Sequence, residues 1–117
     1  MFNNEKAPEI ITKIYDFLLY FIPKISKFPK SQKYLLGDRL EVGALAVLEN
    51  LIEAVYSKEK LPILLKSNIQ LEKLRYMLRL GKDLKLLDLH TYEVASEILY
   101  ELGNQLGGWI KQQRMRH

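Results

Sequence analysis

Two groups of basic side chains are the part of this 117-residue sequence whose residue types and spacing could do chemistry. Lysines crowd the segment KISKFPKSQK, residues 24–33, and a second group, Arg75, Arg79 and Lys82, recurs at intervals of four and three residues. Intervals of three and four place side chains on one face of a helix. Clustered cations of this kind attract anions such as the phosphates of a nucleic acid.

Each basic group also has a structural interpretation that the sequence leaves open. The lysines fit a solvated connector between two helices. The second group fits salt bridges to an acidic row on the following helix, formed by Glu93, Glu97 and Glu101. The net charge of +4 is compatible with an anionic partner and with an ordinary solvated helical surface.

Catalytic and metal-binding residue sets are missing from the sequence. It contains no cysteine, which removes disulfides, thiolate metal sites and cysteine nucleophiles together. Neither His90 nor His117 has a glutamate three residues before it, as a di-metal site in a helical bundle would require. Glycine-rich phosphate loops and Ser/His/Asp sets are absent as well. We therefore predict that the chain is not an enzyme and has no catalytic residue, cofactor or metal.

Apolar residues at helical spacing indicate the elements that position the basic groups. They predict four helices, over about residues 8–28, 31–56, 62–83 and 88–111. Short connections join these helices, so the predicted fold is all-α, an antiparallel up-down-up-down four-helix bundle. The whole chain, residues 1–117, is predicted to be one domain with tails that fray over about 1–7 and 112–117.

Helix ends and interruptions follow from particular residues. Pro23 is expected to kink the first helix, which continues to Phe28. Ser31 and Asp88 are expected to be the N-cap residues of the second and fourth helices. The glycines of the fourth helix are costly in a helix interior, so we expect them to allow close approach of another backbone; they are Gly103, Gly107 and Gly108.

Two apolar stripes lie outside the predicted core faces. The stripe on the second helix consists of Leu45, Leu48 and Ile52. The stripe on the third helix consists of Leu65, Ile69, Tyr76 and Leu80. A contiguous exposed apolar patch is typical of a protein interface, so we predict that both stripes lie in contacts between subunits of a homo-oligomer.

Signals for membrane insertion or secretion are not visible in the sequence. The most apolar run, residues 17–22, is far shorter than the ~20 residues that a membrane span needs. The first ten residues, MFNNEKAPEI, lack the apolar core of a signal peptide. We therefore predict a cytoplasmic protein that does not bind a membrane.

Three blocks of the sequence carry a family resemblance. They are FPKSQKYLLGDRLE at residues 28–41, LEKLRYMLRLGKDLKLL at 71–87 and YEVASEILYELGNQLGGWIK at 92–111. Their order and spacing resemble the accessory variability determinant protein of bacterial and phage diversity-generating retroelements. That family belongs to a wider set of four-helix proteins, which includes those encoded in intervening sequences of bacterial large-subunit ribosomal RNA genes.

The resemblance implies a non-catalytic adaptor. Proteins of this family form a barrel-shaped homopentamer of four-helix bundles with a basic surface. They bind the reverse transcriptase of the same element and nucleic acid, RNA or DNA, and support the mutagenic copying of a template repeat into a variable gene. The alternative is a self-assembling protein of the ribosomal RNA intervening-sequence type with no dedicated nucleic-acid role.

The resemblance also singles out residues. Gly37, Asp38 and Arg39 match the LGDR block of the family, and the basic row of the third helix matches the family's basic helix. With the lysine-rich turn included, the expected nucleic-acid contacts are Lys27, Lys30, Lys33, Arg39, Arg75, Arg79 and Lys82.

Overall fold

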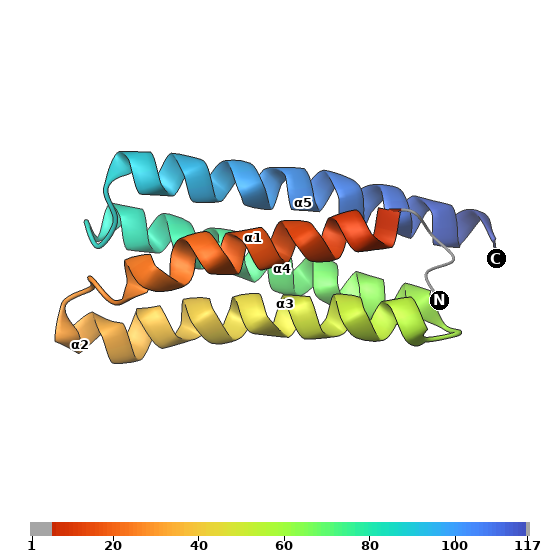
Figure 1. Cartoon of the computed structure of the whole chain (residues 1–117), viewed down its shortest axis with the longest axis horizontal. Coiled ribbons are helices and arrows are strands. Elements are labelled where there is room, and N and C mark those ends of the chain that lie inside the picture. Colours follow the sequence, from red (N-terminus) through yellow and green to blue (C-terminus); the bar gives the residue numbers. More distant parts are fainter. Residues whose placement is uncertain (1–5, 117) are drawn as a thin grey trace.

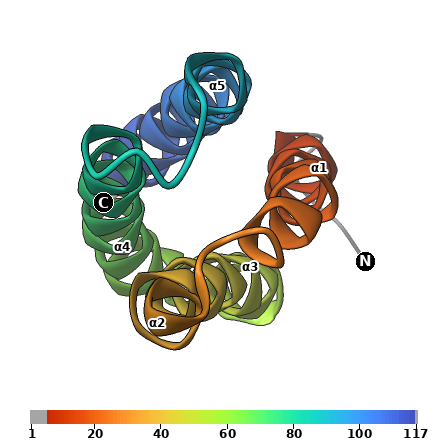
Figure 2. The same cartoon turned by 90° about the vertical axis from the view of Figure 1, so that its left-hand side faces the viewer.

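Four long helices make up the structure, a computed structural model that describes residues 6–116. The elements are α1 (Lys6–Ile25), α2 (Lys30–Gln32), the π-helical turn η1 (Lys33–Gly37), α3 (Asp38–Tyr56), α4 (Lys60–Asp83) and α5 (Leu89–Met115). Figure 1 shows α1, α3, α4 and α5 side by side, and the end-on view of Figure 2 shows them in that order around a square. Each long helix packs against the next, and α5 packs against α1. The predicted up-down-up-down four-helix bundle is confirmed.

The core is made by the apolar stripes that face the bundle axis. On α4 the buried stripe consists of Leu64, Leu71, Leu74 and Leu78. On α5 it consists of Ala95, Leu99, Leu102, Leu106, Trp109 and Ile110. The helical spacing in the sequence predicts these residues as core faces, and it also predicts Tyr92 for the α5 stripe, which the structure leaves half-buried. Each fully buried leucine contributes roughly 1.5–3 kcal/mol to folding relative to an exposed one, so these stripes hold the helices in register.

The first helix passes through Pro23 but ends at Ile25, so the prediction that it continues to Phe28 is wrong. The backbone N–H of Phe28 donates to the Ile25 carbonyl at 3.0 Å, which tightens the chain into a turn. The Ser26 hydroxyl donates to the Pro23 carbonyl at 2.6 Å. The residue before a proline avoids helical backbone angles, and Pro29 follows Phe28 directly. Phe28 is nevertheless buried, because the turn brings it back onto the core.

The second predicted helix is interrupted at its start. Pro29, not Ser31, occupies the N-cap position of α2, and Ser31 is exposed inside that short helix. The π-helical turn η1 follows before the regular helix α3 begins. Gly37 ends η1 and is pressed against α1, since a Cβ at this position would lie 2.8 Å from Ile25 Cγ2. A π turn holds one more residue than an α turn, and this one ends where the chain passes α1.

The last helix begins as predicted. The Asp88 side chain accepts a hydrogen bond from the Thr91 backbone N–H at 2.7 Å, which is N-cap geometry. The helix extends to Met115, beyond the point near residue 112 where the sequence predicts fraying, and Gln113 is buried. It passes through Gly107, where an added Cβ would meet nothing within 4 Å. The predicted close approach of a backbone is therefore wrong at that glycine.

Candidate nucleic-acid interface

The lysine-rich turn lies at one end of the bundle. Lys27 and Lys30 are exposed, and Lys33 is half-buried in η1. Figure 2 views this end, where α2 and the α4–α5 connection both come forward. An added Cβ on Gly81 would contact Leu36 of η1 and Leu87 of the connection, so both segments pack on the last turn of α4. The structure therefore places the lysine turn beside the last turn of α4.

The last turn of α4 adds further cations to this end. Arg79 Nε lies 3.9 Å from Asp83 Oδ2, and Lys82 Nζ lies 3.4 Å from Asp83 Oδ1. One carboxylate thus serves two cations. Lys82 Nζ also stands 4.7 Å from the centre of the Tyr92 ring, a cation–π contact. Arg79 keeps about 63% of its side chain exposed and remains open to an anion.

Lys85 is a basic residue of this end that the sequence analysis does not select. It follows α4 with a φ of 63°, the left-handed conformation that a residue other than glycine seldom adopts. Its side chain is exposed. The signal was a lysine in the connection LKLLDLH, but only the fold shows which end that connection occupies. We call the following group the basic end: Lys27, Lys30, Lys33, Arg79, Lys82 and Lys85.

The N-cap residue Asp88, at the same end of the bundle, has a lowered pKa. Its pKa is lowered from the ordinary value, first by the hydrogen bond from the Thr91 backbone and also by the Thr91 side chain. His90 and Lys24 lower the pKa further through their positive charge. Helix α1 packs against α5 and ends at Ile25, so Lys24 in its last turn lies at the same end of the bundle as Asp88.

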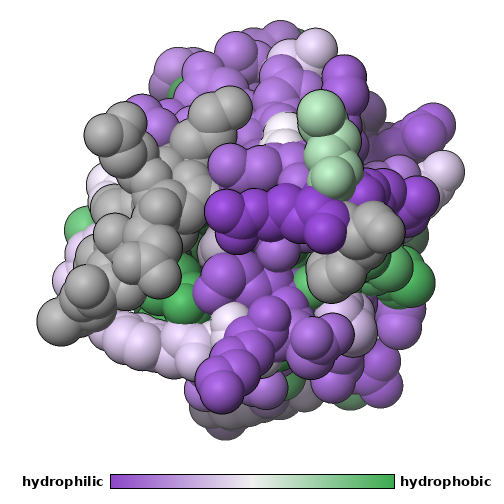
Figure 3. All heavy atoms as spheres, turned by 90° about the vertical axis from the view of Figure 1, so that its right-hand side faces the viewer, coloured by the Kyte–Doolittle hydropathy of each residue, from purple (hydrophilic) through white to green (hydrophobic). Residues whose placement is uncertain are grey.

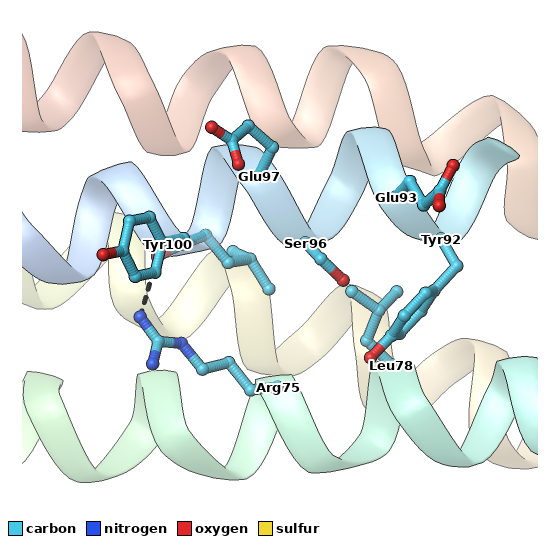
Figure 4. A pocket seen from close by; sticks show the side chains of 8 residues that line it. Arg75, Leu78, Tyr92, Glu93, Ser96, Glu97 and Tyr100 are labelled. Carbon is cyan, nitrogen blue, oxygen red and sulfur yellow. Dashed lines mark hydrogen bonds between the residues drawn. The ribbon is translucent and has the colours of Figure 1, made fainter. Parts of the chain in front are cut away.

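Arg75 does not belong to an open basic row. Its Nη2 donates to the Leu99 backbone carbonyl of α5 at 3.1 Å. Figure 4 draws this bond as a dashed line from Arg75 toward α5. The guanidinium lies against Gly103, where it occupies the position of the missing side chain. Arg75 Nη1 also lies 3.6 Å from Glu72 Oε1 on its own helix. The predicted close approach at Gly103 is thus made by an arginine side chain instead of a backbone, and Arg75 fastens α4 to α5.

The acidic row of α5 is not the partner of the basic row. Arg75 and Arg79 form their ion pairs with acids of α4, so the alternative of salt bridges to α5 is wrong for both. Glu101 instead accepts a hydrogen bond from Lys13 Nζ of α1 at 2.7 Å. That bond raises the pKa of Lys13. Figure 4 shows Glu93 and Glu97 along α5, where they line a shallow cavity of about 550 Å³ with Arg75 and Tyr100.

Arg39, in the first turn of α3, lies in a groove between α3 and α4. The groove has a volume of about 740 Å³ and is lined by Arg39, Asn68, Ile69, Glu72, Lys73, Tyr76 and Met77. Two of these, Ile69 and Tyr76, are residues that the sequence assigns to a subunit interface. The structure therefore brings a predicted nucleic-acid residue together with predicted interface residues.

The predicted interface residues divide between two surfaces. On α4, Ile69, Tyr76 and Leu80 are exposed and Leu65 is half-buried. On α3, Ile52 is exposed, while Leu45 and Leu48 are half-buried beside α1. These two leucines line an apolar groove of about 350 Å³ together with Tyr15, Leu18, Leu19, Ile22 and Pro23.

The α1 side of that groove is missing from the sequence-based prediction. Tyr15, Leu19 and Ile22 are exposed, although they are large and apolar. Their spacing of four and three residues, beside the core stripe of α1, is the signal that could have revealed them.

Two other classes of site find no support in residues 6–116. No group of three or more histidine, aspartate or glutamate side chains there is arranged to hold a metal ion. No helix in the same range combines the length and apolarity that crossing a bilayer requires.

Comparison with known proteins identifies a matching family and a solved structure with a similar fold. The model of the bAvd-like family, bacterial accessory variability determinants, matches residues 10–113. A crystal structure of a protein of unknown function from the S23 ribosomal protein family of Bacteroides thetaiotaomicron superposes with a TM-score of 0.68. The alignment covers 92% of this chain and 96% of that one at 14% identity, so this likeness concerns the fold.

A search of functionally curated proteins finds no match. The family model spans all four long helices, including the basic end and the Arg75–Gly103 contact. The chain belongs to the bAvd-like family of bacterial accessory variability determinants.

Proposed function

We propose that the chain is a non-catalytic accessory protein of a diversity-generating retroelement, which binds nucleic acid through its basic end. The observation that carries the proposal is the convergence of the lysine turn and the last turn of α4 at one end of the bundle. Family membership supplies the biological setting. In that setting the protein works in the cytoplasm as a homo-oligomer, a pentamer, with the reverse transcriptase of the same element as its partner.

The basic end favours contact with the phosphate backbone over recognition of bases. Its cations are five lysines and one arginine, and four of the six are exposed. Such contacts are sequence-tolerant and release counterions, so the affinity falls steeply with salt. Repetition of the basic end around an oligomer multiplies the charge that a nucleic acid meets.

Arg75 and Arg39 are not part of this proposed surface. Arg75 is held by the Leu99 carbonyl and by Glu72, and its side chain is about 37% exposed. Arg39 faces the groove between α3 and α4. The proposed nucleic-acid residues are therefore the six members of the basic end.

A salt titration tests the nucleic-acid part of the proposal. The double variant Lys27→Ala/Lys30→Ala should weaken binding of RNA and of duplex DNA about equally for different sequences. For duplex DNA the salt slope should fall by about 1.8, since each lost phosphate contact removes about 0.9. The matched control is Lys58→Ala/Lys111→Ala, which removes two exposed lysines from the other end of the bundle. That end is also largely hydrophilic where described residues form its surface, as Figure 3 shows.

Equal loss of affinity in both double variants would mean that net charge alone drives binding, and would contradict a site at the basic end. Co-purification with the reverse transcriptase of the same element tests the partner. The second candidate function is a self-assembling protein with no nucleic-acid role, and the exposed apolar residues Ile69, Tyr76 and Leu80 of α4 favour it. Undetectable binding of RNA and DNA at low salt by the unmodified protein would support that candidate.

A further inference from the structure

Two apolar surfaces of different shape lie on different sides of the bundle. The groove surface is concave and lies between α1 and α3; its members are Tyr15, Leu18, Leu19, Ile22, Pro23, Leu45 and Leu48. The stripe surface follows one helix, α4; its members are Leu65, Ile69, Tyr76 and Leu80. A soluble protein that exposes two such surfaces has two contacts to make.

We infer that the stripe surface of one copy docks into the groove surface of the next, head to tail. This inference rests on the oligomer in the proposed function and names its contact. The groove holds about 350 Å³, room for large side chains, and the stripe offers Tyr76, which is 65% exposed. A buried tyrosine is a frequent anchor at interfaces, because its ring buries a large area with few rotatable bonds.

Charge complementarity selects a second copy as the occupant. Helix α3, which forms one wall of the groove, has four acidic residues and one basic residue. Helix α4 has six basic residues and two acidic ones. Helix α1, the other wall, has two acidic and three basic residues, so the two walls together have two more acidic than basic residues. Stripe against groove therefore sets a basic helix against a pair of helices with more acidic than basic residues. Groove against groove or stripe against stripe would set like charges together, which disfavours pairing of identical surfaces.

Individual charges repeat the pattern beside the apolar residues. Glu41 and Glu49 lie four residues before and after Leu45, so they share its face of α3. Lys73 lies four residues after Ile69 and three before Tyr76, within the stripe surface. None of these three charged side chains forms an ion pair with another residue of the described range 6–116. They are available to pair between copies.

A head-to-tail contact between two different surfaces either closes into a ring or continues as a filament, and a closed ring leaves no surface unpaired. In this arrangement the basic ends of all copies lie on one face of the ring. Arg39, beside Ile69 and Tyr76, becomes a residue of the subunit contact.

Two single variants, mixed, test the pairing. Leu19→Glu places a charge in the groove surface and Tyr76→Glu places one in the stripe surface; the residues are 61% and 65% exposed, so each fold should survive. Each variant has lost one half of every contact and should be a monomer by light scattering. A mixture of the two should form a one-to-one dimer, because the intact stripe of the first variant meets the intact groove of the second.

The control variant is Tyr100→Glu, which charges an equally exposed tyrosine on α5, and it should keep the assembly of the unmodified protein. Circular dichroism melts verify that all three variants are folded. Pairing of identical surfaces would give the opposite pattern: each single variant would be a dimer, and mixing would produce nothing new. That pattern, or unchanged assembly of either single variant, would overturn the inference.

Failure of this pairing leaves the proposed function separately testable. The salt titration with Lys27→Ala/Lys30→Ala alters residues outside both apolar surfaces. Nucleic-acid binding by a protein that assembles through other surfaces would contradict the inference alone. Head-to-tail assembly without nucleic-acid binding would contradict the proposed function alone.

Discussion

Arg75 of α4 lies against Gly103 of α5, and its Nη2 donates to the Leu99 carbonyl one helical turn earlier, at 3.1 Å. The glycine leaves the space that the guanidinium occupies. A backbone carbonyl within a helix already accepts one hydrogen bond, and its second lone pair accepts this one. The contact joins two neighbouring helices at mid-length without an acidic partner on α5.

Substitution of Gly103 and of Gly107 in α5 should have different effects on stability. Gly107→Ala should stabilise the protein by roughly 0.4–1 kcal/mol, because an added Cβ meets nothing within 4 Å and alanine restricts the unfolded chain. Gly103→Ala restricts the unfolded chain in the same way, but its Cβ would displace the guanidinium of Arg75. The melting temperature of Gly103→Ala should therefore lie below that of Gly107→Ala. Thermal melts of both variants measure the difference. In the background Arg75→Ala that difference should shrink, and a difference that persists would contradict the contact.

Arg75→Ala and Arg79→Ala should separate stability from binding. Arg75→Ala loses a hydrogen bond to α5 that is worth on the order of 1 kcal/mol, with little change in the affinity for nucleic acid. Arg79→Ala should weaken nucleic-acid binding and leave the melting temperature within about 1 °C, because its ion pair with Asp83 is exposed. A melt and a binding titration on each variant give the comparison. Loss of affinity in Arg75→Ala without loss of stability would contradict the assignment of that residue to the fold.

Gly37→Ala should destabilise the protein, because its Cβ would lie 2.8 Å from Ile25 Cγ2. Overpacking of this kind costs typically about 1–3 kcal/mol. Urea denaturation measures the free energy of unfolding. The control is Gly43→Ala, whose Cβ would make ordinary contacts of 3.7 Å with Leu74 and Met77. An equal change in the free energy of unfolding of the two variants would show that the Ile25 side chain can move away from an added Cβ.

Asp88 should make stability depend on pH in the acid range. Its pKa is lower in the folded protein than in the unfolded chain, chiefly because of the hydrogen bond from Thr91. The stabilisation is therefore present above the unfolded pKa of about 3.9 and is lost as the pH falls through the lower folded pKa. Melting temperatures of the unmodified protein and of Asp88→Asn across pH 2–7 should converge at the acid end. Asparagine keeps the capping oxygen without titrating, so parallel curves would contradict this role.

The fold could be read from the sequence because helical periodicity is a local property. Leu71, Leu74 and Leu78 share one face of any helix that contains them, and a bundle must bury that face. The Asp88 cap is equally local, since the side chain and the Thr91 N–H are three residues apart. The bAvd-like family could be recognised for a related reason, because the blocks that carry the resemblance are continuous in sequence.

Residues whose role depends on a distant neighbour could be predicted only in part. Intervals of four and three place Arg75, Arg79 and Lys82 on one face of α4, but they do not show that Gly103 opens a place for the first of them. The same limit applies to Arg39, which lies beside Tyr76 in the α3–α4 groove. Hydrogen-bond partners on another helix are set by how two helices pack, and spacing along one helix carries no information about that.

The sequence by itself determined which faces of the helices are apolar, which residues are charged and where one cap forms. The tertiary structure decided which charged side chains remain free. Arg75 is held in a contact between α4 and α5. The η1 segment, which follows the lysine turn, packs through Leu36 on Gly81 in the last turn of α4, beside Leu87. The physical reason is that periodicity specifies directions around each helix axis, while the sites depend on distances between helices, which only packing fixes.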